Sequence, residues 1–305
     1  AVDQPYRLNT GRVRDQWHTM TRTGLSPRLS QHLGEPFLEI HPADAADLGL
    51  GHATLAELTK GPARAILRVM ISDRVAQGYP FAPMHWTGET APTGRIDTLI
   101  PGLTDPHSGQ PASKSAAVAI RPFAARWYGF AVANRAFRPE CPYWARVPLP
   151  GGMQAELAGI EAPEDWAMWS ANLFGLTAPH MSYSDPGRGL HRLAFLDQGR
   201  LAAALFIAPE PVALSRSHLA ASLGTEADLS LLAGRPGADR PDPGPQVCAC
   251  FNVGVNTIAR AISNQGLASV EAIGDARRAG TNCGSCRPEL RALLQRHSPM
   301  REAAE

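Results

Sequence analysis

The first third of the chain alternates apolar and polar positions in short runs that turn residues separate. Residues 37–40 (F-L-E-I) and 65–71 (A-I-L-R-V-M-I) have the composition of β-strands, and the second run is apolar enough to be buried. Residues 41–50 (H-P-A-D-A-A-D-L-G-L) predict a short helix that ends near Gly49. Strands with only occasional helical turns favour a barrel over a doubly wound parallel sheet. We therefore expect residues 1–121 to form a β-barrel domain.

From residue 122 to residue 234 the pattern of apolar and polar positions predicts both helices and strands. An amphipathic stretch over residues 165–174 predicts a helix, and residues 190–208 predict a β-hairpin that turns at the D-Q-G of residues 197–199. This range suggests an α+β middle domain, and no motif in it carries chemistry. Four tryptophans are expected in its core or at an interface rather than stacked on a cofactor, namely Trp127, Trp144, Trp166 and Trp169.

A Pro- and Gly-rich stretch precedes the last part of the chain. Residues 235–245 (R-P-G-A-D-R-P-D-P-G-P) are too rich in these two residue types for a core element, so they predict a mobile linker. Residues 246–305 then predict a small helical domain. Asn256 and Ser269 are suitable N-caps for two of its helices, and Pro288 suits the first helical position of a third. The chain is therefore expected to be a multidomain α+β protein.

Composition limits the classes of function. The chain has 305 residues, a formal net charge of +1 and no basic run, which argues against a nucleic-acid partner. No apolar stretch approaches the roughly 18 to 20 residues of a membrane span, and no signal peptide is visible. The sequence lacks an initial Met and enters strand-like sequence almost at once, so we expect a piece of a longer polypeptide. Five cysteines, four of them in close pairs, indicate a reducing compartment and a metal site rather than a disulfide framework.

The paired cysteines are the strongest chemical signal. Cys248 and Cys250 form a C-x-C pair, and Cys283 and Cys286 form a C-x-x-C pair, each just ahead of a predicted helix start. Free backbone N–H groups there can stabilise thiolate ligands. Zinc uses the same four ligands but favours wider spacing than C-x-C, so the spacing favours a [2Fe–2S] cluster and leaves zinc and unligated thiols open. Cys141 is expected to be a buried or idle thiol.

A second candidate site lies near the N-terminus, in L-N-T-G-R-V-R-D-Q-W-H-T-M-T-R (residues 8–22). A strand ends there, Gly11 permits a tight turn, and a dense set of hydrogen-bond donors follows that could bind a large polyanion. No P-loop or G-x-G-x-x-G accompanies it, so an ordinary nucleotide fold is not indicated. The alternative is a polar turn with an Arg ion pair and a half-buried Trp. The candidate donors are Thr10, Arg12, Gln16, Trp17, His18, Thr19, Thr21 and Arg22.

The cysteine-bearing segments resemble a known domain. C-x-C-F-N-V-G-V-N-T-I and G-T-N-C-G-S-C-R-P-E-L look like the [2Fe–2S] domain related to bacterioferritin-associated ferredoxin, over about residues 247–295. The resemblance favours a [2Fe–2S] cluster strongly over a zinc site. It implies that the ligands are Cys248, Cys250, Cys283 and Cys286.

The N-terminal segment resembles a second family. T-G-R-V-x-x-x-W-H-T is similar to the cofactor-binding segment of bis-molybdopterin guanine dinucleotide oxidoreductases. The full sequence of this segment resembles the corresponding segment of bacterial assimilatory nitrate reductases. Two further segments resemble the same family, F-A-P-M-H-W-T (residues 81–87) and T-D-P-H-S-G-Q-P-A-S-K (residues 104–114). The resemblance implies a six-stranded, double-psi-like barrel that closes over the dinucleotide tails. It also implies that the cofactor is bound by Thr10, Gly11, Arg12, Val13, Trp17, His18, Thr19, Met84, His85, Asp97 and Lys114. Among these, Asp97 stands where relatives often have Asn.

Together the resemblances imply the C-terminal part of a cytoplasmic assimilatory nitrate reductase. Nitrate would be reduced to nitrite at a molybdenum bis-molybdopterin guanine dinucleotide centre, with electrons relayed through the [2Fe–2S] cluster. The donor would be a ferredoxin, a flavodoxin or an NADH-dependent reductase subunit. The molybdenum ligand and a [4Fe–4S] cluster are expected in the N-terminal catalytic part of the same enzyme. This chain would then hold no catalytic residue and be inactive alone.

Two alternatives remain at this stage. One is a non-catalytic electron-transfer or metal-binding protein whose β-domain holds no cofactor. The other keeps the molybdenum fold and changes the substrate, for example to formate, because the residues nearest molybdenum would lie outside this sequence. Neither a nucleic acid nor a membrane is expected as a partner.

Overall fold

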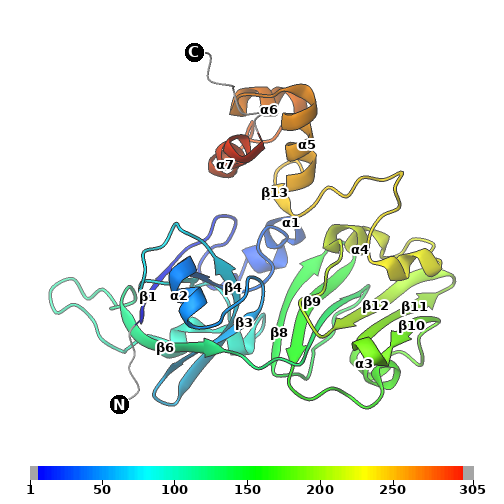
Figure 1. Ribbon diagram of the computed structural model, residues 1–305, viewed down its shortest axis with the longest axis horizontal. Coiled ribbons are helices and arrows are strands. Elements are labelled where there is room, and N and C mark those ends of the chain that lie inside the picture. Colours follow the sequence, from blue (N-terminus) through cyan, green and yellow to red (C-terminus); the bar gives the residue numbers. More distant parts are fainter. Residues whose placement is uncertain (1–5, 298–305) are drawn as a thin grey trace.

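The computed structural model describes residues 6–297 and divides them into three parts (Figure 1). A closed barrel comes first, an open sheet with flanking helices follows, and a small helical domain ends the described chain. In Figure 1 this helical domain, drawn in orange to red, lies above the other two parts. None of the helices formed by residues 6–297 combines the length and the apolar character that crossing a bilayer requires.

Six strands form the barrel in the order β1-β5-β2-β4-β3-β6. β1 pairs with β5 and β2 with β4 in parallel, and the other neighbours are antiparallel. Its interior is apolar, with Leu8, Leu38 and Leu67 fully buried, and closure leaves no unpaired sheet edge. The expected six-stranded barrel is therefore confirmed. The strands are β1 (Tyr6–Gly11), β2 (Phe37–Ile40), β3 (Leu55–Lys60), β4 (Ala63–Ile71), β5 (Phe81–Pro83) and β6 (Ala116–Pro122).

Short helical turns connect the barrel strands. His41 caps α2 (Pro42–Asp47) by accepting a hydrogen bond from the Ala43 amide, and Gly49 follows with a φ of +66°, as the sequence predicts. The remaining turns are η1 (Thr23–Leu25), α1 (Pro27–Ser30), η2 (Pro92–Gly94) and η3 (Ile96–Leu99).

The middle part is an antiparallel sheet in the order β10-β11-β12-β7-β9-β8. The predicted hairpin is present, with Gln198 and Gly199 at positive φ between β11 and β12. Asp165 caps the predicted helix α3 (Trp166–Phe174). The other elements are β7 (Trp127–Ala133), β8 (Tyr143–Leu149), β9 (Gly152–Gly159), β10 (Met181–Asp185), η4 (Pro186–Arg188), β11 (Leu190–Asp197), β12 (Arg200–Ala208), α4 (Arg216–Ser222) and η5 (Leu229–Ala233).

The predicted core role of the tryptophans is confirmed. Trp127, Trp166 and Trp169 meet edge to face, with ring centroids 5.1 to 6.1 Å apart, in the core between α3 and the sheet. Trp144 is buried in the same core. Their aromatic surface is therefore used in packing.

A buried charge network joins the barrel to the sheet. Arg68 in β4 donates two hydrogen bonds to Glu35, both at 2.9 Å, and the Tyr143 hydroxyl donates to the same carboxylate at 2.6 Å. Arg216 bonds both carboxylate oxygens of Glu156 in β9, which lies 3.8 Å from Arg68. Burial alone would lower the pKa of Arg68, but the neighbouring carboxylates more than offset this and raise it. The guanidinium therefore stays charged and holds the two parts together.

The helical domain consists of three helices packed around a small apolar core, in which Ile258, Ile262 and Ile273 are fully buried. Ser269 caps α6 through the Ala272 amide, as predicted. The predicted cap at Asn256 is wrong, because α5 begins at Val255 and Gly254 occupies the cap position without a side-chain bond. Only glycine fits there, since a Cβ atom would lie 2.1 Å from the Pro243 carbonyl oxygen. Pro288 is the second residue of α7, one position later than predicted. The elements of this domain are β13 (Gln246–Cys248), β14 (Val253–Gly254), α5 (Val255–Gln265), α6 (Val270–Arg277) and α7 (Arg287–His297).

The predicted linker, residues 235–245, contains no helix or strand, but its end is held. Asp242 accepts hydrogen bonds from the Ser215 hydroxyl and from the Gly244 amide, both at 2.9 Å. The Val255 and Asn256 amides donate to the carbonyls of Pro245 and Pro243. The mobility of the linker stays a prediction, and these contacts involve its last four residues.

Candidate functional site

The candidate polyanion-binding loop begins where β1 ends, at Gly11. Three non-glycine residues within it adopt left-handed backbone conformations: Asp15 at φ +70°, His18 at +48° and Met20 at +61°. Such conformations cost free energy and persist only where surrounding contacts impose them. The loop therefore has a defined shape that its local sequence does not favour.

His85 imposes much of that shape. It lies just after β5, has no exposed surface, and uses both of its ring nitrogens on the loop. Nε2 accepts a hydrogen bond from the Val13 amide at 3.0 Å, and Nδ1 lies 2.6 Å from the His18 carbonyl oxygen. Because an amide donates to Nε2, the proton is on Nδ1 and the ring is neutral. Burial lowers the pKa of His85, which agrees with this tautomer. Its place in the site is thus to hold Val13 and His18 in position.

Arg12 and Trp17 form the exposed face of the loop. The Arg12 guanidinium lies 4.7 Å from the centre of the Trp17 ring, and the His18 ring meets Trp17 edge-on at 4.7 Å. Trp17 is 54% exposed. No ion pair engages Arg12 among residues 6–297. An accessible cation held over an accessible aromatic ring suits a pyrophosphate-bearing ligand, so the residues present fit the implied dinucleotide.

Gly11 and its neighbours link the loop to the long segment before β6. Thr10 donates to the Ser113 carbonyl at 2.6 Å, and the Lys114 ammonium donates to the Thr10 carbonyl. The Met84 amide donates to the Gly11 carbonyl at 3.0 Å, while the Met84 side chain is exposed. A Cβ atom at residue 11 would lie 2.9 Å from the Phe81 ring, so the glycine is needed for close packing. These predicted residues are therefore brought together around the end of β1.

Two predicted cofactor-binding residues are engaged elsewhere. Asp97 lies in η3 and forms an exposed ion pair with Arg95 at 2.6 Å. Thr19 is exposed, and its hydroxyl lies 3.2 Å from that of Thr21. Within the part of the chain that the structure describes, no side-chain hydrogen bond connects Asp97 or Thr19 to His85 or Lys114. Their contact with a cofactor stays a prediction.

The four paired cysteines gather at the base of the helical domain, two from each segment. Cys250 Sγ and Cys283 Sγ lie 3.3 Å apart near the surface, and Cys248 contacts Cys286 in the interior. Each of these two contacts joins one thiol of the C-x-C pair to one thiol of the C-x-x-C pair, and within residues 6–297 no three His, Cys, Asp or Glu side chains are grouped closely enough to hold a single metal ion. A [2Fe–2S] cluster takes two thiolates on each of its irons. The donor set therefore fits such a cluster.

Polar neighbours distinguish the outer thiol pair from the inner pair. The Ser285 hydroxyl lies 3.1 Å from Cys283 Sγ, and Asn282 Nδ2 donates to Cys250 Sγ at 3.3 Å. The hydrogen bonds from Ser285 lower the pKa of Cys283, whereas burial, followed by the nearby Cys248, raises that of Cys286 to about 11. Hydrogen bonds therefore favour the thiolate form of Cys283, whereas burial disfavours that of Cys286.

The fifth cysteine lies apart. The Cys141 thiol donates to the Tyr143 carbonyl at 3.1 Å, and burial raises its pKa to about 12. It therefore remains an inert thiol at neutral pH, as the sequence suggests.

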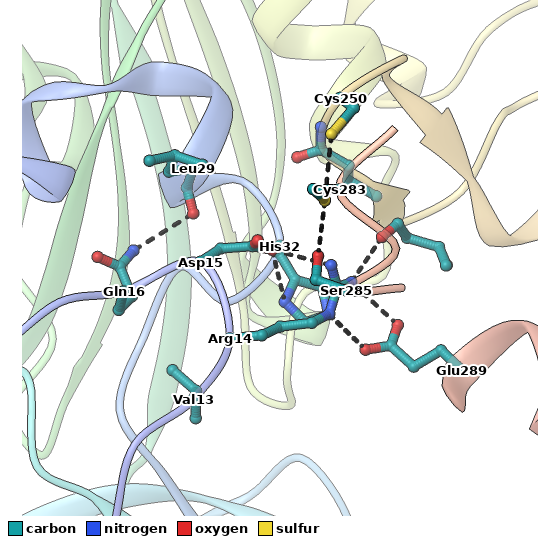
Figure 2. A network of polar contacts seen from close by, with 12 residues as sticks. Val13, Arg14, Asp15, Gln16, Leu29, His32, Cys250, Cys283, Ser285 and Glu289 are labelled. Atoms are coloured by element: carbon teal, nitrogen blue, oxygen red, sulfur yellow. Dashed lines mark hydrogen bonds and ion pairs between the residues drawn. The ribbon is translucent and has the colours of Figure 1, made fainter. Parts of the chain in front are cut away.

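Figure 2 shows that the two candidate sites meet. Arg14, in the loop after Arg12, forms hydrogen bonds of 2.8 and 3.2 Å to the two carboxylate oxygens of Glu289 in α7. His32 Nε2 lies 3.1 Å from the same carboxylate. Arg14, His32 and Glu289 are not among the site residues that the sequence predicts. Nothing in their own chemistry sets these three residues apart in the sequence. Because Arg14 and Glu289 are 275 positions apart, no local sequence pattern could predict that they meet.

Comparison with known proteins accords with both sites. Residues 6–117 match the family described as "Molydopterin dinucleotide binding domain", and residues 246–296 match the "BFD-like [2Fe-2S] binding domain". A nitrate reductase from Klebsiella oxytoca is 36% identical over 308 aligned residues, which cover 95% of this chain and 34% of the relative. The chain thus spans about a third of the length of that curated relative.

Shorter alignments connect this chain to related enzymes. The assimilatory nitrate reductase catalytic subunit of Bacillus subtilis (strain 168) is 31% identical over 122 residues, or 40% of this chain and 17% of the relative. The F420-dependent formate dehydrogenase 1 subunit alpha of Methanococcus maripaludis is 29% identical over 118 residues, or 39% of this chain and 17% of the relative. The chain therefore carries a molybdopterin dinucleotide-binding domain and a BFD-like [2Fe–2S] domain in one polypeptide, and it is similar to nitrate reductases along most of its length.

Proposed function

We propose that this chain is part of an assimilatory nitrate reductase, in which it encloses the molybdopterin dinucleotide and delivers electrons toward it. The proposal rests on one contact. Arg14, in the candidate polyanion-binding loop that follows Gly11 (from here on the cofactor-binding loop), bonds Glu289 in the cysteine-bearing helical domain. An electron-transfer domain serves a redox centre only if it lies close to it, and here the two candidate sites share a junction.

Nitrate is the substrate that the alignments support best. The nitrate reductase of Klebsiella oxytoca aligns over 95% of this chain, through the barrel, the sheet and the cysteine-bearing domain. The formate dehydrogenase subunit alpha aligns over only 39%. The reaction is the two-electron reduction of nitrate to nitrite, and the molybdenum cofactor supplies its oxygen-atom chemistry when bound.

This chain supplies binding and positioning. Arg12 and Trp17 present charge and an aromatic face to the dinucleotide, and His85 keeps the intervening backbone in place. Cys248, Cys250, Cys283 and Cys286 hold the [2Fe–2S] cluster. Cys283 is exposed, so one side of the cluster is open to a small donor such as a ferredoxin, a flavodoxin or an NADH-dependent reductase subunit.

The molybdenum ligand and a [4Fe–4S] cluster belong to an N-terminal catalytic part of the enzyme, so this chain alone does not reduce nitrate. We place the enzyme in the cytoplasm, which the assimilatory relative in Bacillus subtilis supports. The middle sheet aligns with the Klebsiella relative, but no chemistry is assigned to it.

Metal analysis and substrate assays test the proposal together. The reconstituted chain is expected to hold iron and acid-labile sulfide in equal amounts, with an electron paramagnetic resonance signal on reduction. The complete enzyme is expected to oxidise a reduced viologen with nitrate. Stoichiometric zinc in the chain would overturn the electron-transfer assignment. Formate oxidation by the complete enzyme, without nitrate reduction, would overturn the substrate.

A further inference from the structure

The Arg14 guanidinium contacts both segments that carry the paired cysteines. It bonds Glu289 through two nitrogens at 2.8 and 3.2 Å, and Nη2 also donates to the Val247 carbonyl at 2.5 Å. Val247 immediately precedes Cys248, and Glu289 lies in the first turn of α7, just after Cys286. One side chain of the barrel therefore restrains both halves of the cluster site.

The same side chain is anchored on the cofactor-binding loop. Nη1 bonds Asp15 at 3.0 Å, and Asp15 has a left-handed backbone at φ +70°. The preceding residue, Val13, is held by His85. Only 17% of the Arg14 side chain is exposed, so its contacts are largely shielded from water and from salt screening.

A second bridge runs beside the first. His32, which follows α1, has Nε2 at 3.1 Å from the Glu289 carboxylate and Nδ1 at 3.5 Å from that of Asp15. The carboxylate of α7 thus receives an arginine and a histidine from the barrel part of the chain. Figure 2 shows this group directly beside Ser285 and Cys283.

We propose that Arg14 is the positioning residue that docks the [2Fe–2S] domain on the cofactor-binding loop, with Glu289 as its acceptor. The domain is then held in one orientation by a short bidentate contact rather than trailing on a linker. The planar guanidinium matches a carboxylate and a carbonyl at once, which a lysine ammonium cannot reproduce. The docking half of this proposal stands on the contacts alone. Its consequence for electron transfer rests on the proposed function.

Amide hydrogen exchange on the reconstituted chain tests the docking. In Arg14→Gln, peptides from residues 12–18 and 283–290 should both exchange faster. Loss of the charge-assisted contacts predicts an increase on the order of tenfold to a hundredfold. Arg14→Lys should fall between wild type and Arg14→Gln, and Glu289→Gln should reproduce Arg14→Gln. The matched control is Arg74→Gln, which removes an Arg–Glu pair within the barrel, at 2.7 Å from Glu39. It should leave both peptides unchanged.

A general loss of stability would raise exchange throughout the barrel, including residues 116–122, and that result would overturn the positioning role. So would unchanged exchange at both sides of the junction. Iron and sulfide content is measured on every variant, and exchange is compared between chains of equal content because residues 283–290 include Cys283 and Cys286. A wild-type chain that binds no cluster refutes the proposed function, and comparing it with Arg14→Gln in the same cluster-free state still tests the docking.

In the complete enzyme, the rate at which nitrate removes the reduced [2Fe–2S] signal provides a second readout. It should fall at least tenfold in Arg14→Gln at unchanged cluster content, and an unchanged rate would refute the electron-transfer consequence.

Discussion

The amide of Val13 donates a hydrogen bond to Nε2 of His85, across 72 positions of sequence and at a distance of 3.0 Å. The opposite nitrogen of the same ring lies 2.6 Å from the His18 carbonyl oxygen. A single buried imidazole therefore spans the loop that presents Arg12 and Trp17. The shape of the candidate cofactor site depends on a residue that itself has no exposed surface.

His85→Ala should destabilise the chain and release the loop. The substitution leaves a buried cavity and an unpaired amide at Val13, which together predict a loss of about 2 to 4 kcal/mol in the free energy of unfolding. Urea titration of the purified chain measures this change. His107→Ala, at an exposed position of the 104–114 segment, is the control and should be neutral. Equal stability of the two variants would contradict the role assigned to His85.

The stability of the wild-type chain should also depend on pH through His85. Burial lowers its pKa in the folded state, so only the unfolded chain takes up the proton as pH falls below about 6.5. The contribution of His85 is thus complete above that pH and declines between it and the lowered folded pKa. His191 and His218 have pKa values lowered in the same direction by burial, so the difference between wild type and His85→Ala isolates this residue. Parallel curves of unfolding free energy against pH would refute the prediction.

Gly11→Ala should destabilise the end of β1 through contact with Phe81. The added Cβ would lie 2.9 Å from the ring, and overpacking of this kind costs about 1 to 3 kcal/mol. Phe81→Leu in the same chain should recover part of the loss, which a double-mutant cycle on unfolding free energies measures. Gly88→Ala meets no atom within 4 Å and serves as control. A cycle without coupling would mean that the ring is not the obstacle.

Arg12→Ala in the complete enzyme should reduce molybdenum cofactor content while the iron–sulfur signal persists. Loss of one charge-assisted bidentate contact is worth roughly 1.5 to 3 kcal/mol, or about tenfold to a hundredfold in affinity. Arg12→Lys should restore part of it. Molybdenum and iron are assayed after dilution and dialysis. Arg64→Ala, on an exposed barrel arginine 3.5 Å from Glu57, should retain both metals. Full molybdenum retention in Arg12→Ala would leave Arg12 as an ordinary residue of a polar turn.

Cys283→Ala should abolish cluster assembly, whereas Cys141→Ala should not. Cys283 lies against Cys250 and accepts stabilising hydrogen bonds, while Cys141 remains protonated with a pKa of about 12 and bonds a backbone carbonyl. Iron and acid-labile sulfide per chain, measured after anaerobic reconstitution, distinguish the two. Full iron and sulfide in Cys283→Ala would show that this cysteine is not a ligand.

Features that depend on a few neighbouring residues could be predicted from the sequence. The turn at Gln198 and Gly199, the cap at Ser269 and the paired cysteines all follow from local backbone preferences or from spacing. The cap at Asn256 could not be predicted correctly, because the Pro243 carbonyl leaves room only for glycine at residue 254.

Sequence by itself determined part of the strand and helix segments, including residues 37–40, 65–71 and 165–174, together with the pairing of the cysteines along the chain and the motif around Gly11, because these features depend on short stretches whose chemistry is local. Tertiary structure alone decided which residues shape and connect the two sites. His85 reaches the loop through the parallel pairing of β1 with β5, and Arg14 meets Glu289 only after the barrel has closed and the helical domain has packed against it. Such contacts join residues 72 and 275 positions apart, and their geometry is set by the packing of the whole chain rather than by the preferences of either segment.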